Sequence, residues 1–381
     1  MKLDMLLQAY PNVKLATRED NSRILEYFNQ SQLNNAKDAV IYKRSDDFFS
    51  LLRARSENYL VLFIELKGKI KGMASMSYHQ AYVDQKLTTV GYLGDLRISL
   101  DKKAIVIWRK FYQDFLKNSP NMKETQNCQH YYSALMNSNA RSNNTLVEGK
   151  VEKVQYQLEN AFTMVNVIGR YPYLPRQKEF HLKTGALSST EMNFVEEIEG
   201  KRKFGLDWKN EYSYRLKHWQ NFDESNFIKV YFEGELLAVT SFWDPSAHKT
   251  IQLNRISSSI KYVSSLLSHL PLFHFKKAPK PYSNLNIIYL NQINFKENLS
   301  SKEKEKILKN LFLYLLEHCK GSDSISYCNL DFENIENIGY PFFTEKLEMG
   351  IYSIKLNQEV DKLDKKKGQV NGPLSFDMQL V

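Results

Sequence analysis

The sequence predicts a mixed α/β protein made of two successive domains that share one order of helices and strands. Three observations support this prediction. Alternating, strand-like runs and amphipathic, helix-like runs follow one another along most of the chain. Each half contains a hairpin signal with glycine in the turn, at Lys67-Gly68 and at Glu233-Gly234. The length of 381 residues is about twice that of a typical domain.

The first half alternates short strands with helices. In order, its predicted elements are a strand at 13–17, a helix capped within 18–22, a hairpin of 59–66 with 69–77, a strand at 88–99, a helix, a strand at 131–136, a short helix at 139–147 and a pair of strands within 154–168. The helix after 88–99 has one apolar face, formed by Trp108, Phe111, Tyr112, Phe115 and Leu116.

The second half repeats this order. Its predicted elements are a hairpin at 230–240, a strand at 286–295, a helix, a strand at 324–330 and a last strand at 350–356. The helix opens with Ser300-Ser301-Lys302-Glu303, which has the form of a capping box. An alternative register equates 250–256 with the strand at 88–99. The register at 286–295 is preferred, because only it leaves a long capped helix between two apolar strands.

The two halves are separated by a stretch with two prolines and no periodicity, which we interpret as a linker. The predicted organisation is a first domain at 1–170, a linker at 171–176, a second domain at 177–357 with an insertion at about 256–282, and a polar tail at 358–381.

Composition limits the partners. Lys and Arg number 52 against 43 Asp and Glu, and the net charge of +9 favours anionic partners. No dense basic helix or RNA-binding signature is present, which argues against nucleic acid. The three cysteines lack zinc spacing, the histidines show no HExxH pattern, and no metal site is predicted. Without a signal peptide or a membrane-length apolar run, a reduced cytoplasmic location is expected.

Three segments carry a resemblance to a known family: GYLGDLRIS, SALMNSNARSNN and NIGYPFFTEKLEMGIYSI. With the order of elements, they resemble the GNAT superfamily of N-acetyltransferases, and two copies resemble its tandem-GNAT proteins. The resemblance implies two tandem GNAT-like domains, each a mixed, splayed β-sheet flanked by helices. It also implies acetyl-CoA as cosubstrate, held between two splayed parallel strands of the first domain.

The resemblance further implies cofactor-binding residues. Leu96, Arg97 and Ile98 would face the pantetheine arm, and Lys102–Trp108 would form the pyrophosphate loop, with Lys103, Val106, Ile107 and Trp108 as its residues. The family loop runs Arg/Gln-x-x-Gly-x-Gly/Ala, and its aligned positions are Lys103, Val106 and Trp108. Lysine keeps the positive charge, but both glycines are replaced by bulky residues. The corresponding segment of the second copy, 298–305, lacks glycine and contains acidic residues.

Acetyl transfer to an amine requires a base, and Asp95 is the candidate. The alternative is a structural carboxylate that caps a loop or pairs with Arg97. Asn139 matches a family asparagine that contacts the cofactor, and helix capping would explain it equally well. The usual tyrosine acid is not evident, since Thr145 and Leu146 occupy the nearest positions.

The predicted function is therefore transfer of an acetyl or related acyl group from acyl-CoA to an amine, on a small molecule or a protein. Two alternatives remain open from the sequence. One is a catalytically inactive GNAT-like binding or scaffold protein, which the missing glycines favour. The other is an acyltransferase whose donor is bound to a carrier protein.

Overall fold

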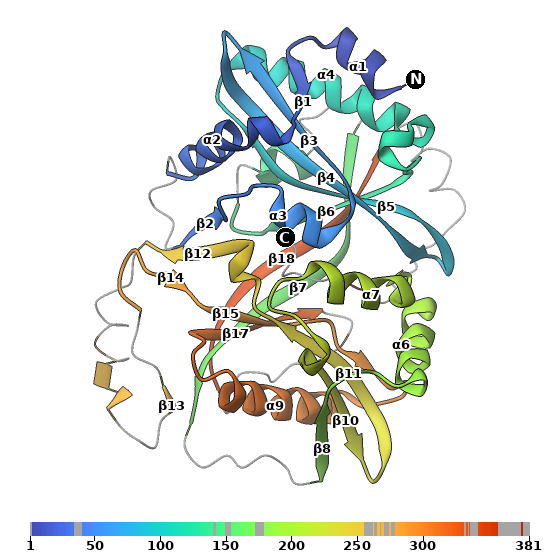
Figure 1. Ribbon diagram of the computed structural model, residues 1–381, viewed down its shortest axis with the longest axis vertical. Helices are drawn as coiled ribbons and strands as arrows, with labels where there is room; N and C mark the ends of the chain where they lie inside the picture. The colour runs from blue at the N-terminus through green and yellow to red at the C-terminus, as the bar shows by residue number, and fades with distance from the viewer. Residues whose placement is uncertain are drawn as a thin grey trace.

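The computed structural model has helices on both faces of one long mixed β-sheet, with a small second sheet at its side (Figure 1). It describes residues 2–33, 40–139, 142–148, 154–171, 179–254, 262, 265–266, 268–269, 274–275, 279–330, 333, 335, 342–356 and 375. The predicted mixed α/β class is confirmed.

The large sheet runs through both halves of the chain. In spatial order its strands are β1 (Val13–Leu15), β3 (Asn58–Leu66), β4 (Lys69–Val83), β5 (Lys86–Ile98), β6 (His130–Met136), β18 (Phe342–Leu356), β7 (Val154–Arg170), β17 (Ser324–Leu330), β15 (Ile287–Leu290), β11 (Glu235–Trp243), β10 (Phe227–Phe232) and β8 (Phe180–Thr184). At its sides, β9 (Phe204–Leu206), β13 (His274–Phe275) and β16 (Asn294–Phe295) pair with β4, β7 and β11. Two pairs in this order are parallel, β5 with β6 and β15 with β17.

Both predicted hairpins are present. β3 and β4 are joined at Lys67-Gly68, where φ is 51° and 71°, and β10 and β11 are joined at Glu233-Gly234, where φ is 48° and 84°. Two successive positive φ angles match the twist of antiparallel strands, and glycine adopts the second without strain. The preferred register is also confirmed, because β15 pairs with β17 whereas β12 (Lys249–Leu253) lies in the small sheet.

Helices cover the first half of the sheet on both faces. α1 (Leu3–Ala9) and α4 (Lys102–Asn118) pack on one face, and α2 (Asn21–Leu33) and α3 (Ser50–Arg55) on the other. Successive side chains of β3 point to opposite faces of the sheet and so enter both cores. Leu60 and Leu62 face α4, while Val61 and Phe63 face α2. The five apolar residues predicted on α4 are all buried, as their helical spacing indicated.

The second half is arranged in the same way. α9 (Ser301–His318) packs on one face and buries Ile307, Leu308 and Leu311. α6 (Ser189–Lys201) and α7 (Trp208–His218) pack on the other face, where α3 of the first half joins them. Short helical turns connect these elements: η1 (Arg18–Asp20), η2 (Ser119–Asn121), η3 (Lys123–Thr125), η4 (Asn143–Val147), η5 (Glu224–Asn226) and η6 (Pro245–Ala247).

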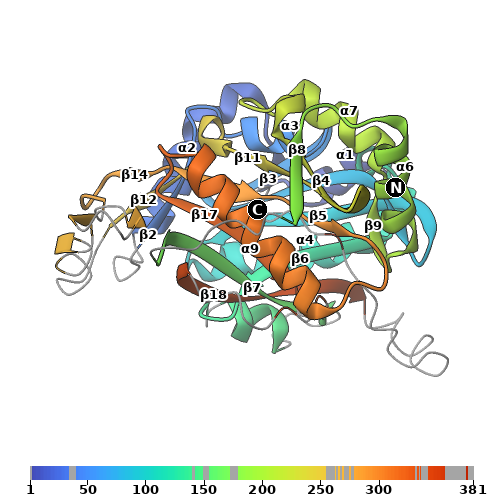
Figure 2. The same cartoon turned by 90° about the horizontal axis from the view of Figure 1, so that it is seen from below.

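Two long strands hold the halves together. β18 lies between β6 and β7, and it pairs with β7 from Phe342↔Arg170 to Leu356↔Val154 (Figure 2). The start of β7 therefore enters the core of the first half, and its end enters the core of the second. The sequence predicted a pair of strands within 154–168 and a last strand beginning at 350. Both predictions are wrong, because one continuous β7 and an earlier start of β18 bury more backbone in the shared sheet.

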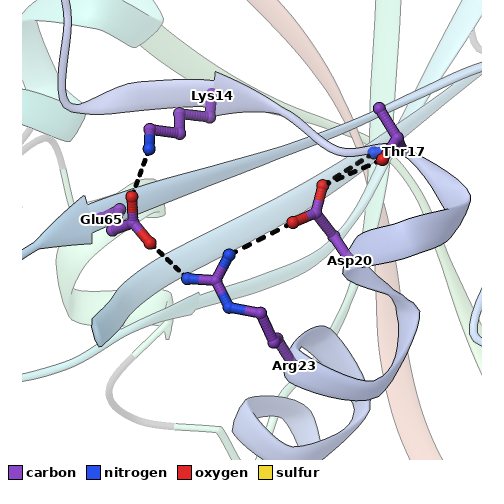
Figure 3. A network of polar contacts seen from close by, with 5 residues as sticks. All are labelled: Lys14, Thr17, Asp20, Arg23 and Glu65. Atoms are coloured by element: carbon purple, nitrogen blue, oxygen red, sulfur yellow. Dashed lines mark hydrogen bonds and ion pairs between the residues drawn. The ribbon is translucent and has the colours of Figure 1, made fainter. Parts of the chain in front are cut away.

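A polar network fixes α2 on the sheet (Figure 3). Glu65, at the end of β3, accepts hydrogen bonds from Lys14 of β1 and Arg23 of α2. These two bonds lower the pKa of the Glu65 carboxyl group. Asp20 binds Arg23 and closes a capping box with Thr17. The network orients α2, whose inner face contributes to the site below.

The small sheet consists of β14 (Asn284–Leu285), β12 and β2 (Val40–Arg44). It links the halves, since β2 belongs to the first and β12 to the second. The linker at 171–176, most of the insertion at 256–282 and nearly all of the tail at 358–381 lie outside the described residues. The division into domains stays a prediction. Within the described residues, no helix combines the length and apolarity that crossing a membrane requires.

Candidate functional site

The parallel strands β5 and β6 part soon after they meet. They pair over a short stretch that ends at Tyr92↔Tyr132, and beyond it β5 continues along β4 while β6 continues along β18. Directly beyond the last pair, Leu93 and Ser133 are still buried, and the Ser133 hydroxyl donates to the Leu93 carbonyl at 2.9 Å. Further along, Leu96 is 38% and Met136 40% exposed. We call this divergence the first fork. The predicted splay between two parallel strands is present.

A β-bulge lies in β5 directly after the fork. Met73 pairs with Arg97 and Ser75 with Gly94, so Asp95 and Leu96 together oppose one residue of β4. Asp95 has a φ of 53°, which is uncommon for a residue with a side chain. Bulges redirect side chains, and this one turns the Asp95 carboxylate toward Ser75, whose hydroxyl donates to it at 2.7 Å.

Asp95 is buried in a strongly cationic environment. Burial alone raises its pKa, but the charges of Arg44 and Arg55 and the hydrogen bonds from Ser75 and Arg44 outweigh burial and bring it to about 2. The sequence offered Arg97 as a possible ion-pair partner. The structure gives that place to Arg44 of β2, whose Nη2 donates to Asp95 Oδ1 at 2.6 Å.

The three residues predicted to face pantetheine point in different directions. Leu96 is exposed at the bulge. The Arg97 guanidinium stacks over the ring of Phe28 in α2, with its carbon 3.9 Å from the ring centre, and burial lowers its pKa to about 10. Ile98 packs on the opposite face, against the core that contains α4. Their backbone borders the fork, and a role in cofactor binding stays a prediction.

The predicted pyrophosphate loop is wrong in its secondary structure. β5 ends at Ile98 and α4 begins at Lys102, so Val106, Ile107 and Trp108 are helical. Asp101 is the N-cap, and its carboxylate accepts hydrogen bonds from the amides of Lys103 and Ala104 at 2.9 and 3.2 Å. An anionic cap satisfies the first amides and stabilises the helix dipole, which favours early helix formation.

Trp108 does not fill the volume in front of the helix N-terminus. Its indole is 5% exposed and stacks on Tyr112, with ring centres 6.1 Å apart and planes at 11°. Val106 is 51% exposed and Lys103 is exposed, so the solvent-facing side of the first two turns is open. The two bulky residues at the family's glycine positions therefore have ordinary helical roles.

Asn139 caps a turn. Its side-chain oxygen accepts from the amide of Ser142 at 3.1 Å, and its carbonyl accepts from the amide of Asn143 at 3.0 Å. This is the capping interpretation offered by the sequence. Contact with a cofactor stays a prediction.

Sequence reasoning missed three buried cations near Asp95. Arg44 and Lys249 are directly paired across β2 and β12, and Arg55 ends α3. Their side chains are at least nine-tenths buried. One signal was available: Arg55 follows Leu51 and Leu52 at helical spacing, so it shares their buried face. No local sequence pattern predicted the burial of Arg44 or Lys249, because this burial depends on the contact between the two halves.

No family model and no curated protein matches this chain. Solved structures do match. Saccharomyces cerevisiae N-myristoyltransferase with bound myristoyl-CoA aligns with a TM-score of 0.54 at 11% identity, over 90% of this chain and 79% of that one. A tandem GNAT protein from the clavulanic acid biosynthesis pathway aligns with a TM-score of 0.51 at 9% identity, over 90% of this chain and 98% of that one. The chain has a tandem GNAT fold.

The tandem GNAT fold repeats the fork and the bulge in its second copy. β15 and β17 pair in parallel up to Leu290↔Tyr327. Leu290 pairs with Phe242 and Asn294 with Val239, so 291–293 oppose 240–241, again with one extra residue. The duplication therefore extends to the local irregularity of the strand.

The second fork is covered, unlike the first. Asn291 is 2% exposed and Ile293 is fully buried. Arg202, which follows α6, donates to the carbonyl of Ile293 at 3.4 Å and also binds Glu199 and Ser375. Ser375 comes from the C-terminal segment and is 1% exposed. Of the two GNAT copies, the first has the accessible fork.

Proposed function

We propose that this protein transfers an acyl group from a coenzyme A thioester to an amine, with the thioester arm lying in the first fork. The observation that carries the proposal is the first fork itself, where paired parallel strands part beside a bulge and become exposed. The solved structure of similar fold contains myristoyl-CoA, which supports a coenzyme A thioester as donor. An acetyl group as the acyl chain and an amine as acceptor are parts of the proposal.

The fork suits an extended amide-containing arm. Where two strands separate, the facing backbone groups of each lose their partner and can pair with an inserted chain, as in β-strand addition. Pantetheine contains two amides in an extended chain and can make such bonds. The bulge at Asp95 interrupts regular pairing at this point of β5, where a thioester carbonyl would need hydrogen-bond donors.

The pyrophosphate would lie near the first turn of α4. Lys102 and Lys103 are exposed there and supply two positive charges. The Asp101 carboxylate works against a second anion, because it already accepts from two of the first amides. The proposed site therefore depends more on lysine side chains than on backbone amides, and weaker binding than in a glycine-containing loop is expected.

Asp95 as general base also stays part of the proposal. A carboxyl group with a pKa of about 2 is ionised at neutral pH but accepts a proton poorly. The geometry favours a second role, in which Asp95 holds the Arg44 guanidinium beside the fork. Removal of the amine proton by water would then be sufficient for a slow transferase.

The alternative is a GNAT-fold protein that binds its ligand without turnover. Asp101 at the helix N-terminus and the low pKa of Asp95 favour this alternative. A donor carried on an acyl carrier protein is the third candidate, because such a donor needs no second phosphate at the helix. Its discriminating measurement is transfer from an acylated carrier protein in the absence of coenzyme A.

Titration with acetyl-CoA tests the proposal. At a concentration a hundredfold above Kd, the ligand should stabilise the folded protein by about 2.7 kcal/mol in a thermal-shift assay. Lys103→Glu should remove this stabilisation, and it should leave the fold intact because Lys103 is exposed and acidic residues suit the first turn. Lys110→Glu is the matched control, since Lys110 is exposed on the same helix about 10 Å further on. No shift at millimolar acetyl-CoA, or equal loss in both variants, would contradict the proposed site.

A further inference from the structure

Three guanidinium groups, two of them from buried residues, lie around a single carboxylate where β2, α2, α3 and β5 meet. Arg44 and Arg55 are 6% and 7% exposed, and Arg97 lies over Phe28. Among the described residues, Asp95 is the carboxylate paired with them, through its ion pair with Arg44. We call Arg44, Arg55 and Arg97 the buried cationic cluster.

Much of the hydrogen-bonding capacity of this cluster is unused. Within the residues that the structure describes, Nε and Nη1 of both Arg44 and Arg55 are buried without a hydrogen-bond partner, and so is Nε of Arg97. Arg55 contacts the ring of Tyr92, with its guanidinium carbon 4.5 Å from the ring centre, but makes no ion pair with any residue in the described part of the chain. Burying a charged donor without a partner is strongly unfavourable, so an arrangement of this kind is stable when an anion completes it.

A second buried arginine shows what a completed site looks like in this protein. The Arg215 guanidinium carbon also lies 4.5 Å from an aromatic ring, that of Trp219, and Arg215 is 1% exposed. Unlike Arg55, it donates to a carboxylate, that of Glu211, at 2.8 Å. The difference between the two arginines, among the residues described, is that Arg215 has a carboxylate at ion-pair distance and Arg55 does not.

A small surface hollow lies beside the strand pair that carries Arg44. The hollow is lined by Lys249, Tyr289 and Asp244, among other residues. Lys249 is the register partner of Arg44 across β12 and β2, so a residue that lines the hollow lies next to a residue of the cluster. Burial and the charges of Arg44 and Arg55 hold the pKa of Lys249 well below its usual range.

The cluster lies on the face of the sheet opposite α4. Arg97 points toward α2, whereas the next residue, Ile98, packs with the core that contains α4. The N-terminus of α4, where the coenzyme A phosphates would bind, is therefore separated from the cluster by the sheet. A thioester in the first fork would be approached from the cluster side by its acceptor.

We propose that the buried cationic cluster binds a carboxylate or phosphate group of the acceptor, so that the acceptor is an anionic amine. That the bound anion belongs to the acceptor rests on the proposed function. The anion site itself does not depend on it. Guanidinium groups bind both anions through paired hydrogen bonds, which explains three arginines at one place. The phosphates of coenzyme A are the other source of the same chemistry, and the experiment separates the two.

Inorganic phosphate is the probe. In thermal-shift titrations at constant ionic strength, with chloride as the reference anion, phosphate at about 10 mM should raise the melting temperature. At this concentration, general salt effects on stability are too small to dominate. Arg55→Met should weaken phosphate binding about tenfold or more, as expected for the loss of a charge-assisted contact. Without phosphate, this variant should melt at the same or a higher temperature than the parent protein, because it removes an unpaired buried charge. Arg55→Lys, which keeps the charge, should retain part of the response.

Arg215→Met is the matched control: it should melt at a lower temperature and keep the phosphate response. The proposal is overturned by the absence of a phosphate effect in the parent protein, by an equal effect in Arg55→Met, or by an Arg55→Met protein that no longer folds. Repeating the titration with saturating acetyl-CoA identifies the source of the anion. Unchanged phosphate affinity supports the acceptor, and competition assigns the site to coenzyme A. Failure of acetyl-CoA to bind would contradict the proposed function alone.

Discussion

The Arg44 guanidinium, on β2, lies 2.6 Å from the Asp95 carboxylate, at the bulge of β5, and joins the small sheet to the first fork. Both side chains are nearly inaccessible, at 1% and 9% exposure. Each therefore depends on the other for its charge. This dependence makes the pair sensitive to mutation.

Asp95→Asn should destabilise the protein by about 3–5 kcal/mol, because it leaves a buried guanidinium without its carboxylate. Urea denaturation at pH 7 measures the loss. The double variant Asp95→Asn/Arg44→Met should recover part of it, since the unpaired charge is gone as well. Equal stability of the single and double variants would contradict this account of the pair.

The same pair predicts acid sensitivity. The pKa of Asp95 in the folded protein is about 2, below the value of about 3.9 in an unfolded chain. A depressed carboxyl pKa contributes stability above about pH 4, and that contribution is lost as the pH falls toward 2. Asp95→Asn should lack this portion of the acid transition. If Asp95 is instead the catalytic base, the variant should keep acetyl-CoA binding and lose turnover.

His248 should make stability fall at mildly acidic pH. Burial and the nearby charges of Arg53 and Arg44 lower its pKa to about 4, and its Nδ1 hydrogen-bonds with Ser50. In the unfolded chain the pKa is about 6.5, so stability is full above this value and falls by on the order of 2 kcal/mol toward pH 4. His248→Gln should flatten this slope between pH 7 and 4.5. Ser50→Ala keeps the buried imidazole and should keep the slope.

Asp101 should oppose binding of a phosphorylated cofactor at α4. Asp101→Asn retains an N-cap side chain but removes the charge, so acetyl-CoA should bind several-fold more tightly with little change in stability. Asp101→Ala loses the cap and should destabilise the protein by about 1 kcal/mol. Calorimetric titration of both variants checks the effect. Unchanged affinity in Asp101→Asn would mean that the phosphates lie elsewhere.

Trp108 should act only through packing. Trp108→Ala should destabilise the protein by about 3–5 kcal/mol, because the indole is buried against Phe111 and Tyr112. It should not create a tighter phosphate site, since the helix continues through this position. Stronger acetyl-CoA binding by the variant at a temperature where it is folded would contradict the helical role.

Local patterns in the sequence predicted several elements of the fold. The turns at Lys67-Gly68 and Glu233-Gly234, the capping box at Ser300 and the apolar face around Trp108 each depend on neighbours within a few residues, and the structure contains all of them. The β5 strand and the splay after it could also be predicted. The start of α4 was not predicted. The resemblance implied a loop at Lys102–Trp108, whereas Asp101 caps a helix that begins at Lys102.

The sequence by itself determined the two hairpin turns, the capped helix at Ser300 and the apolar face of α4, because periodicity and turn chemistry act over short distances. Tertiary structure alone decided that β18 enters between β6 and β7, that the second fork is covered, and that Arg44 faces Lys249. These features join residues from opposite halves of the chain. The free energy that stabilises these features comes from burial and charge interactions between surfaces that exist only once both halves have folded. Local sequence patterns therefore cannot predict them.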